Sequence, residues 1–479
     1  MKFETARILF NRTEAFGEAV AYREKNALGE WTDYSYRRLK DDVNGLTAYL
    51  YSLGLKGKHI GVMGPNSYRW ITAYLSVLCG LGVAVLIPAD APREEIETLV
   101  KAADVDVLLA DDRLTALADG IVPAYAFSLL AEKAEEGLRM ISVGSVRLSD
   151  TEPAPDDLCK IIFTSGTTGE RRGVMLTQKN IMCIVSSGFV PLVGKTSVSV
   201  LPLSHAFECV CHILTMIALG GTMYLCQSLR SFPQAVAQSG AESLFIVPAL
   251  AEALLTKFRP FLDKAVKLKR VVCGGAPIPK QLVDEYAKIG ISLLAGYGLS
   301  ECAPLVSLDD HGAAGTVGTV GEYCRVRISG DGEIQVRGEN VMSGYYKNEA
   351  ATRAAFTEDG WLRTGDLGEF DADGNLCLTG RIKNLIILPN GENVSPEELE
   401  TRMINRVPGV VDALCRADGA LLAMTVYLGG DTSEEALESV KKAVAAENNL
   451  LPAHKRIQKV DLTGEPFPVS ATGKKIRKS

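Results

Sequence analysis

A series of short apolar runs, separated by stretches of helical length, constrains the fold of this 479-residue chain most. Runs such as VAVLIP and CKIIFTS lack the polar alternation of a half-exposed strand, so they fit strands buried on both faces. Strands that alternate with helices predict helix-covered parallel sheets, which bind ligands at the carboxyl ends of their strands. The candidate strands span 59–64, 83–88, 105–110, 159–165, 197–203, 243–248, 270–275 and 291–298.

One apolar stretch, WITAYLSVLCGLGVAVLIP at 70–88, has no charged residue and resembles a membrane span in length. A spanning helix needs about 20 apolar residues without a break. Here Gly80-Leu81-Gly82 interrupts the run, and the half that follows is rich in β-branched residues. We therefore predict a helix, a turn and a buried strand, and no transmembrane segment.

The residue pattern changes after about residue 310. Gly/Asp turn sequences recur from there on and predict antiparallel hairpins. From about residue 384 the pattern predicts a small α+β domain. Its SPEELE segment predicts a helix with Ser395 as N-cap and Glu398 closing a capping box, and SEEALESVKKAVAAENN predicts a second helix. Since the chain exceeds what one core usually supports, we expect a large domain at 1–382 and a small one at 384–479.

Overall charge and cysteine spacing bear on the binding partners and the cellular location to be expected. The net charge of -7 and the pI of about 5.5 argue against a nucleic-acid-binding protein, which is usually basic. The eleven cysteines show no regular spacing, and no secretory signal opens the sequence. These features favour free thiols and a cytoplasmic location.

The loop FTSGTTGERRGV at 163–174 directly follows a predicted strand and is rich in glycine and hydroxyl side chains. Such a loop lets backbone N–H groups and hydroxyls converge on phosphate oxygens. It does not fit the G-x-x-x-x-G-K-[ST] pattern of a P-loop. Taken alone, it fits a surface linker equally well.

Three further segments carry candidate polar groups. Glu301 in LSECAP could hold Mg²⁺ or merely cap a helix, and the neighbouring Tyr297 could stack on a base. Asp366 in TGD could accept the hydroxyls of a ribose, although this turn is common. Arg381 in GRIKN could reach a ribose or phosphate. The terminal ATGKK could be a solvated basic tail, or could present a lysine to a phosphoryl-transfer transition state.

Taken in order, the motifs TSGTTG, LPLSHAFE, GGAPIP, GYGLSE, GEI, MSGYY, TGD, GRIKN and ATGK resemble those of the adenylate-forming enzyme superfamily. The similarity spans essentially the whole chain, and LPLSHAFE, VMSGYYKN and GENVSPEELE are most similar to the fatty-acyl-CoA synthetase (long-chain-fatty-acid–CoA ligase) branch. It implies an α/β fold: a large N-terminal domain of stacked, mostly parallel sheets flanked by helices, a β-barrel-like part, and a small mobile α+β lid domain.

The resemblance also implies roles for individual residues. In this superfamily the loop holds the ATP phosphates, two glycine turns form the adenine pocket, and later segments serve Mg²⁺ and the ribose. The residues implied for the nucleotide are Thr164, Ser165, Gly166, Thr167, Thr168 and Gly169 for phosphates, Gly274, Gly275, Ala276, Pro277, Gly296, Tyr297 and Gly298 for adenine, Ser300 and Glu301 for phosphate and metal, and Asp366 and Arg381 for the ribose.

The implied reaction has two halves. A carboxylate, expected to be that of a fatty acid, attacks the α-phosphorus of ATP to give acyl-AMP and pyrophosphate, and the thiol of CoA then displaces AMP. The implied catalytic residues are Lys474, Glu301 and His205, of which His205 borders the acyl pocket or is a hydrogen-bonded core histidine. Rotation of the small domain about Lys383 separates the two steps and brings Gly391 to the thiol channel.

The sequence departs from the superfamily pattern in places. Arg171-Arg172 replaces the usual Pro-Lys, and Ser300 replaces the commoner threonine. In the terminal motif, alignment from the glycine selects Lys474, whereas alignment from the Ile-Arg that follows selects Lys475. Two other functions therefore stay open: an acyl-AMP ligase that serves a separate carrier protein, and a non-catalytic nucleotide- or acyl-binding protein. The Cys209-x-Cys211-His212 segment lacks a second zinc-like pair, so we interpret it as core.

Overall fold

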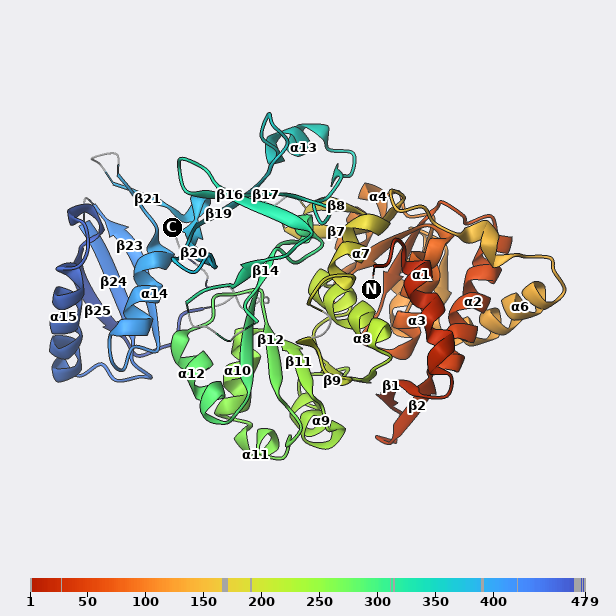
Figure 1. Cartoon of the computed structure of the whole chain (residues 1–479), viewed down its shortest axis with the longest axis horizontal. Coiled ribbons are helices and arrows are strands. Elements are labelled where there is room, and N and C mark those ends of the chain that lie inside the picture. Colours follow the sequence, from red (N-terminus) through yellow and green to blue (C-terminus); the bar gives the residue numbers. More distant parts are fainter. Residues whose placement is uncertain are drawn as a thin grey trace.

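The computed structural model describes residues 2–26, 28–165, 171–189, 192–310, 312, 315–388, 392–419, 421–468, 475 and 477, with the backbone alone at Ser165. Figure 1 shows the early part of the chain on the right, the later strands of the large domain in the centre, and the C-terminal part on the left. The α/β class with mixed, mainly parallel sheets and a small C-terminal domain is confirmed. The boundary at Lys383 stays a prediction.

The first large sheet has seven strands in the order β18-β8-β7-β4-β3-β5-β6. Its inner strands are parallel and consist mainly of buried apolar residues, as their runs predict, although Lys160 is buried among them. The strands are β3 (His59–Met63), β4 (Val83–Ile87), β5 (Val107–Ala110), β6 (Ala124–Ala126), β7 (Leu158–Ser165), β8 (Arg171–Thr177) and β18 (Gly344–Tyr345). Both β8 and β18 run antiparallel to their neighbours at one edge.

The second large sheet has nine strands in the order β15-β14-β13-β12-β11-β9-β10-β1-β2. Its strands are β1 (Val20–Lys25), β2 (Trp31–Ser35), β9 (Thr196–Ser199), β10 (Thr222–Leu225), β11 (Ser243–Ile246), β12 (Arg270–Cys273), β13 (Ser292–Tyr297), β14 (Ser307–Leu308) and β15 (Thr319–Val320). The predicted strand at 197–203 is wrong beyond Ser199. Pro202 cannot donate to a ladder, and the side chain of Asn66 binds Leu201 O and Leu203 N instead.

The apolar stretch at 70–88 forms the predicted helix, turn and buried strand. Helix α3 (Tyr68–Ser76) continues into a π-helix, η2 (Val77–Leu81), before β4 begins. Gly80 has φ +119°, and a Cβ there would lie 1.8 Å from the Thr151 carbonyl oxygen, so glycine is required for this close approach. Among the described residues, no helix is both long and apolar enough to cross a membrane.

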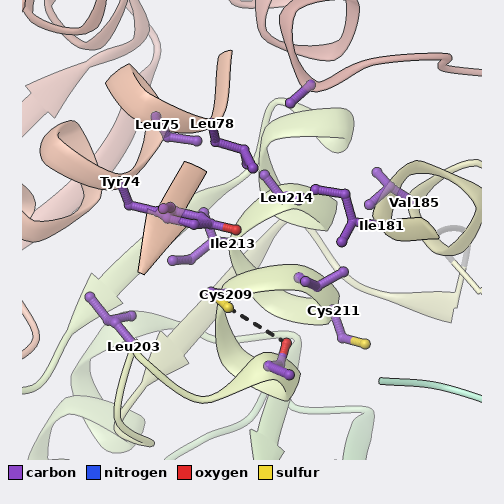
Figure 2. Packing of buried hydrophobic residues seen from close by; sticks show 14 of the residues in the cluster. Tyr74, Leu75, Leu78, Ile181, Val185, Leu203, Cys209, Cys211, Ile213 and Leu214 are labelled. Carbon is purple, nitrogen blue, oxygen red and sulfur yellow. Dashed lines mark hydrogen bonds between the residues drawn. The ribbon is translucent and has the colours of Figure 1, made fainter. Parts of the chain in front are cut away.

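Helices cover both faces of the two sheets. They are α1 (Ala6–Asn11), α2 (Tyr36–Ser52), α4 (Arg93–Ala102), α5 (Asp112–Thr115), α6 (Leu130–Ser142), α7 (Gln178–Val185), α8 (Ile213–Leu219), α9 (Phe232–Ser239), α10 (Pro248–Leu255), α11 (Arg259–Leu262) and α12 (Lys280–Lys288). Figure 2 shows the core where Tyr74 of α3 and Ile181 of α7 lie around Cys209 and Cys211. This packing of three distant segments ties the two halves of the large domain together.

The hairpins predicted after residue 310 form a four-stranded antiparallel sheet. Its strands are β16 (Cys324–Ile328), β17 (Glu333–Gly338), β19 (Leu362–Phe370) and β20 (Leu376–Arg381), in that order, and helix α13 (Glu349–Ala355) precedes β19. Register pairs Asp366 of β19 with Arg381 of β20. The sheet thus brings together two of the residues predicted to bind the ribose.

The C-terminal part has its own core and a three-stranded sheet. Its elements are η9 (Ile382–Asn384), β21 (Ile386–Ile387), β22 (Asn393–Val394), α14 (Pro396–Arg406), β23 (Asp412–Asp418), β24 (Leu421–Tyr427), α15 (Glu434–Asn448) and β25 (Ile457–Thr463). Ser395 caps α14 as predicted, by accepting from Glu398 N. The other half of the capping box is wrong, because the Glu398 carboxylate binds Lys455 Nζ at 2.7 and 2.8 Å instead.

Candidate active site

The glycine-rich loop leaves the carboxyl end of β7 and returns as β8, at the edge of the seven-stranded sheet. Thr164 is paired with Arg172 across this hairpin, and the backbone of Ser165 with Arg171. The loop therefore starts where parallel α/β sheets bind ligands, as the sequence predicts. The other predicted phosphate contacts, Gly166, Thr167, Thr168 and Gly169, lie outside the described residues.

The two arginines that follow the loop point in different directions. Arg171 forms an ion pair with Glu95 of α4 on the surface. The Arg172 guanidinium lies 5.5 Å from the centroid of the Tyr345 ring, and its Nε is buried without a described hydrogen-bond partner. Of the two cations, Arg172 is the one that faces the remaining candidate residues.

Glu301 lies in a 3-10 turn, η8 (Ser300–Cys302), directly after β13. One of its carboxylate oxygens accepts a 2.9 Å hydrogen bond from the Tyr345 hydroxyl. No other described residue donates to this carboxylate. Burial, together with the negative charge of Glu301, raises the pKa of Tyr345, so the phenol stays a donor. A half-buried carboxylate with one oxygen held and the other available is a suitable ligand for a hard cation such as Mg²⁺.

The glycine turns after β12 and β13 lie side by side. A Cβ on Gly274 would lie 3.4 Å from Gly296 O, and a Cβ on Gly298 would lie 1.8 Å from Pro304 O. The latter clash excludes any side chain at Gly298. Gly275 is exposed, Ala276 half-buried and Pro277 exposed in the loop after β12. The residues predicted for adenine thus lie at two adjacent strand ends, an arrangement that leaves backbone accessible to a flat ligand.

Asp366 is the most enclosed of the predicted nucleotide-binding carboxylates, with 5% of its surface exposed. It accepts a hydrogen bond from the Tyr297 hydroxyl at 2.9 Å, and Arg381 Nε lies 2.6 Å from its other oxygen. Burial and the charge of Asp366 raise the pKa of Tyr297. The Arg381 side chain is 41% exposed, so the pair is open to solvent on one side only.

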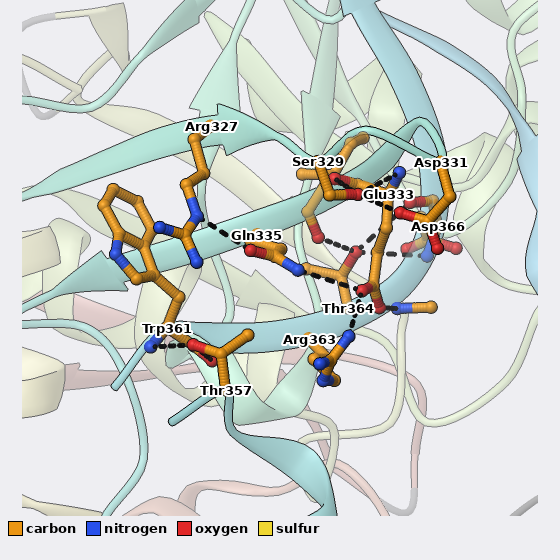
Figure 3. A network of polar contacts seen from close by, with 12 residues as sticks. Arg327, Ser329, Asp331, Glu333, Gln335, Thr357, Trp361, Arg363, Thr364 and Asp366 are labelled. Carbon is orange, nitrogen blue, oxygen red and sulfur yellow. Dashed lines mark hydrogen bonds and ion pairs between the residues drawn. The ribbon is translucent and has the colours of Figure 1, made fainter. Parts of the chain in front are cut away.

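A polar network under Asp366 fixes its turn (Figure 3). The buried Glu333 of β17 accepts from Gly365 N at 3.1 Å, from Gln335 at 3.2 Å and from Arg363 at 3.1 Å. Thr364 Oγ1 donates to Ile334 O at 2.7 Å and accepts from Asp366 N. The TGD turn is therefore held rigidly at both of its ends, a condition for precise ligand binding.

His205 and the cysteine-rich segment belong to different environments. His205 is exposed beside the start of a π-helix, η7 (Phe207–His212), and the Phe207 ring comes within 3.9 Å of where a Gly274 Cβ would lie. His212 is fully buried and bonds Glu208 and Ser197, both at 2.7 Å. Cys209 and Cys211 are buried free thiols. The second segment is thus core, as predicted, whereas His205 is exposed, and it is Phe207, two residues later, that lies beside the glycine turn.

Comparison with known proteins decides the family. The AMP-binding enzyme family matches residues 10–346, and the AMP-binding enzyme C-terminal domain matches residues 383–479. The chain belongs to the AMP-binding enzyme family. The resemblance drawn from the motifs is confirmed.

Several relatives of this AMP-binding enzyme are named CoA ligases, which supports an AMP-forming acyl-CoA synthetase. A feruloyl-CoA synthase from Amycolatopsis sp is 31% identical over 406 residues, covering 79% of both chains. The long-chain-fatty-acid–CoA ligase FadD15 of Mycobacterium bovis is 30% identical over 448 residues, covering 78% of this chain and 74% of that one. A sulfoacetate–CoA ligase from Cupriavidus necator is 35% identical over 279 residues, which are 54% of each chain.

Solved structures show the same fold. The anthranilate CoA ligase AuaEII, in complex with anthranoyl-AMP, superimposes with a TM-score of 0.82 over 99% of this chain and 96% of that one, at 19% identity. ATP-bound MatB from Rhodopseudomonas palustris has a TM-score of 0.81 over 98% and 97% of the two chains, at 23% identity.

The terminal lysines of this AMP-binding enzyme are distinguished by their contacts. Lys475 Nζ binds Asp412 at 2.6 Å and the Ala413 carbonyl at 2.5 Å, and lies 3.6 Å from Glu400. Lys475 is thus engaged within the small domain. The other two residues predicted for this domain, Lys474 and Gly391, lie outside the described residues.

Two residues at the site were not among the sequence predictions. Tyr345 belongs to the MSGYY motif, whose position in the series was noted but not its contact with Glu301. Glu333 lies in the GEI motif, on the strand beside the TGD turn. The sequence offers no clear signal for Glu333, because its strand, EIQVRG, also carries Gln335 and Arg337.

Proposed function

We propose that the protein activates a carboxylic acid with ATP, forming acyl-AMP and pyrophosphate, and then transfers the acyl group to the thiol of CoA. The family match supports the reaction class. The single observation that carries the proposal to this chain is the Asp366–Arg381–Tyr297 arrangement, a buried carboxylate whose paired arginine reaches solvent, at the strand end that leads into the second glycine turn. Such a carboxylate suits the two hydroxyls of a ribose.

The other residues then take roles around the ribose. The adenine would lie against the turns at Gly274 and Gly298, and the triphosphate would extend toward the loop after Thr164. Glu301 would hold Mg²⁺, which supplies positive charge beside the phosphates. Arg172 would add a second cation on the loop side. His205 would border the carboxylate of the acid, next to Phe207.

We further propose that Lys474 stabilises the charge that develops at the α-phosphate during adenylation. The engagement of Lys475 by Asp412 and Ala413 supports this choice between the two lysines. The small domain would rotate about Lys383 after pyrophosphate leaves, removing Lys474 and bringing Gly391 to the channel for CoA. Such alternation lets one site run two steps.

For the acid, we propose an aliphatic fatty acid, as in the long-chain relative. Feruloyl and sulfoacetate ligases among the relatives show that a family member can carry other acids. The test is pyrophosphate release over a series of acids from acetate to palmitate, with ferulate and sulfoacetate added, without and with CoA. Release that rises with CoA and yields AMP supports the CoA ligase. Release unchanged by CoA indicates a carrier-protein acceptor, and absence of release with every acid contradicts the proposal.

A further inference from the structure

Two adjacent tyrosines in the YYKN segment each donate a hydrogen bond to a carboxylate, but at different places. Tyr345 donates to Glu301 at 2.9 Å, at the candidate site. Tyr346 donates to Asp104 at 2.6 Å on the surface, where Lys347 also pairs with Asp104. The surface contact holds the segment on the loop before β5. Only the inner contact involves a candidate site residue.

The backbone of Tyr345 is held by contacts of its own. Its N–H donates to Thr352 Oγ1 at 2.9 Å, and its strand pairs with Val174 of β8. Arg172, two residues earlier on β8, places its guanidinium over the Tyr345 ring. Tyr345 thus contacts both β8, the strand that follows the phosphate loop, and Glu301 in the turn after β13.

The contact with Glu301 determines how that carboxylate can act. Tyr345 occupies Oε1, and no described residue donates to Oε2. A carboxylate held at one oxygen loses rotational freedom and keeps the other oxygen for a ligand. Residues that hold a metal ligand in this way commonly change metal affinity when they are removed.

We propose that Tyr345 is a positioning residue that orients Glu301 toward the metal–nucleotide complex. The Tyr345 ring also packs against the guanidinium of Arg172, which supplies a positive charge next to the phosphate loop. This inference rests on the proposed function, because it needs ATP and a divalent cation at the site. It assigns to the MSGYY motif a task in metal-dependent nucleotide binding. Tyr346, although adjacent, has no part in it.

The experiment is calorimetric titration of ATP into the full chain over a range of Mg²⁺ concentrations, without any acid substrate. For Tyr345→Phe we expect the Mg²⁺ concentration that gives half-maximal ATP affinity to rise roughly 10-fold. Saturating Mg²⁺ should restore most of the affinity. A purely structural loss would not be restored by metal. Tyr346→Phe is the matched control and should leave the Mg²⁺ dependence unchanged.

Coupling to Glu301 gives a second readout that is independent of folding losses. In a Glu301→Gln background, Tyr345→Phe should no longer shift the Mg²⁺ dependence, because the group it orients is gone. On the loop side, Arg172→Met should weaken ATP binding at every Mg²⁺ concentration, Arg172→Lys should recover part of it, and Arg171→Met should match the wild type.

The outcomes separate this inference from the proposed function. If the wild type binds no ATP at any Mg²⁺ concentration, the proposed function fails. If it binds ATP in a Mg²⁺-dependent way and Tyr345→Phe shows the same dependence, the positioning role is wrong. Equal shifts in Tyr345→Phe and Tyr346→Phe would also overturn it, since they would indicate a general loosening of the segment.

Discussion

The candidate site and the core of the small domain each bury a carboxylate against an arginine, but the two carboxylates have different sets of partners. Asp366 is 5% exposed, and its oxygens meet one phenol and one half-exposed arginine. Glu400 is 4% exposed, and its two oxygens accept from both terminal nitrogens of Arg477, at 2.8 and 2.7 Å, and from Cys415 N at 2.7 Å. The two carboxylates are equally buried, but the arginine paired with Asp366 is 41% exposed and the one paired with Glu400 is 24% exposed.

The difference teaches how to distinguish a binding carboxylate from a structural one by its partners. Glu400 is saturated within its own domain, where Arg477 and Cys415 join the C-terminal residues to α14 and β23. Asp366 is placed by a rigid turn, and its partner Arg381 has a side chain that is 41% exposed. Burial alone would have ranked the two groups equally.

The largest effect expected is on nucleotide binding at Asp366. Asp366→Ala removes the proposed acceptor of two ribose hydroxyls. Each such hydrogen bond to a charged group is worth about 1.5–3 kcal/mol, so kcat/KM should fall by roughly 10²–10⁴. Steady-state kinetics with ATP varied would measure this loss. A tenfold or smaller loss would show that the ribose lies elsewhere.

Glu400→Ala should lower the stability of the fold and leave ATP binding unchanged. The substitution removes the paired acceptor of Arg477, which keeps, among the described residues, only Glu397 at 3.3 Å, and leaves Cys415 N without its acceptor, so the free energy of unfolding should fall by about 1–3 kcal/mol. Urea denaturation of the full chain measures this cost, and ATP affinity of the remaining folded protein should equal that of the wild type. An unchanged midpoint together with lost ATP binding would erase the contrast between the two carboxylates.

The two terminal lysines should differ in the same way, with Lys474 acting in catalysis and Lys475 in stability. Lys474→Ala should lower the adenylation rate by roughly 10²–10³ while stability changes by less than about 0.5 kcal/mol. Lys475→Ala should keep adenylation and lose stability, because its ammonium binds Asp412 and Ala413 in the folded chain. Single-turnover pyrophosphate release and thermal unfolding measured on both variants decide between them. If the activity loss falls on Lys475→Ala, the assignment is reversed.

The smallest effect is expected at Asp104, a carboxylate on the surface. Hydrogen bonds from Lys347 and Tyr346 lower the pKa of Asp104 in the folded chain. Its stabilising contribution is therefore present above the ordinary pKa of an aspartate and is lost as pH falls through the lowered value. Solvent screening limits it, so Asp104→Asn should cost less than about 1 kcal/mol at pH 7 and nothing at low pH. Urea midpoints at several pH values would test this.

The strands of the large sheets could be predicted from the sequence. Short apolar runs that alternate with stretches of helical length indicate strands buried on both faces by helices. The prediction overextended the strand at 197–203, since the bonds from Asn66 that form the loop come from a residue far away in the sequence. The positions of Glu301, Asp366 and Arg381 followed from motifs at strand ends. Their partners did not, because Tyr345 reaches Glu301 across 44 residues and Tyr297 reaches Asp366 across 69.

The most direct test of the central claim is exchange of labelled pyrophosphate into ATP, measured with and without a carboxylic acid and in the absence of CoA. We expect acid-dependent exchange in the wild type, its loss in Asp366→Ala and its retention in folded Glu400→Ala. Exchange that survives Asp366→Ala, or a wild type with no exchange for any acid in the series, would contradict it.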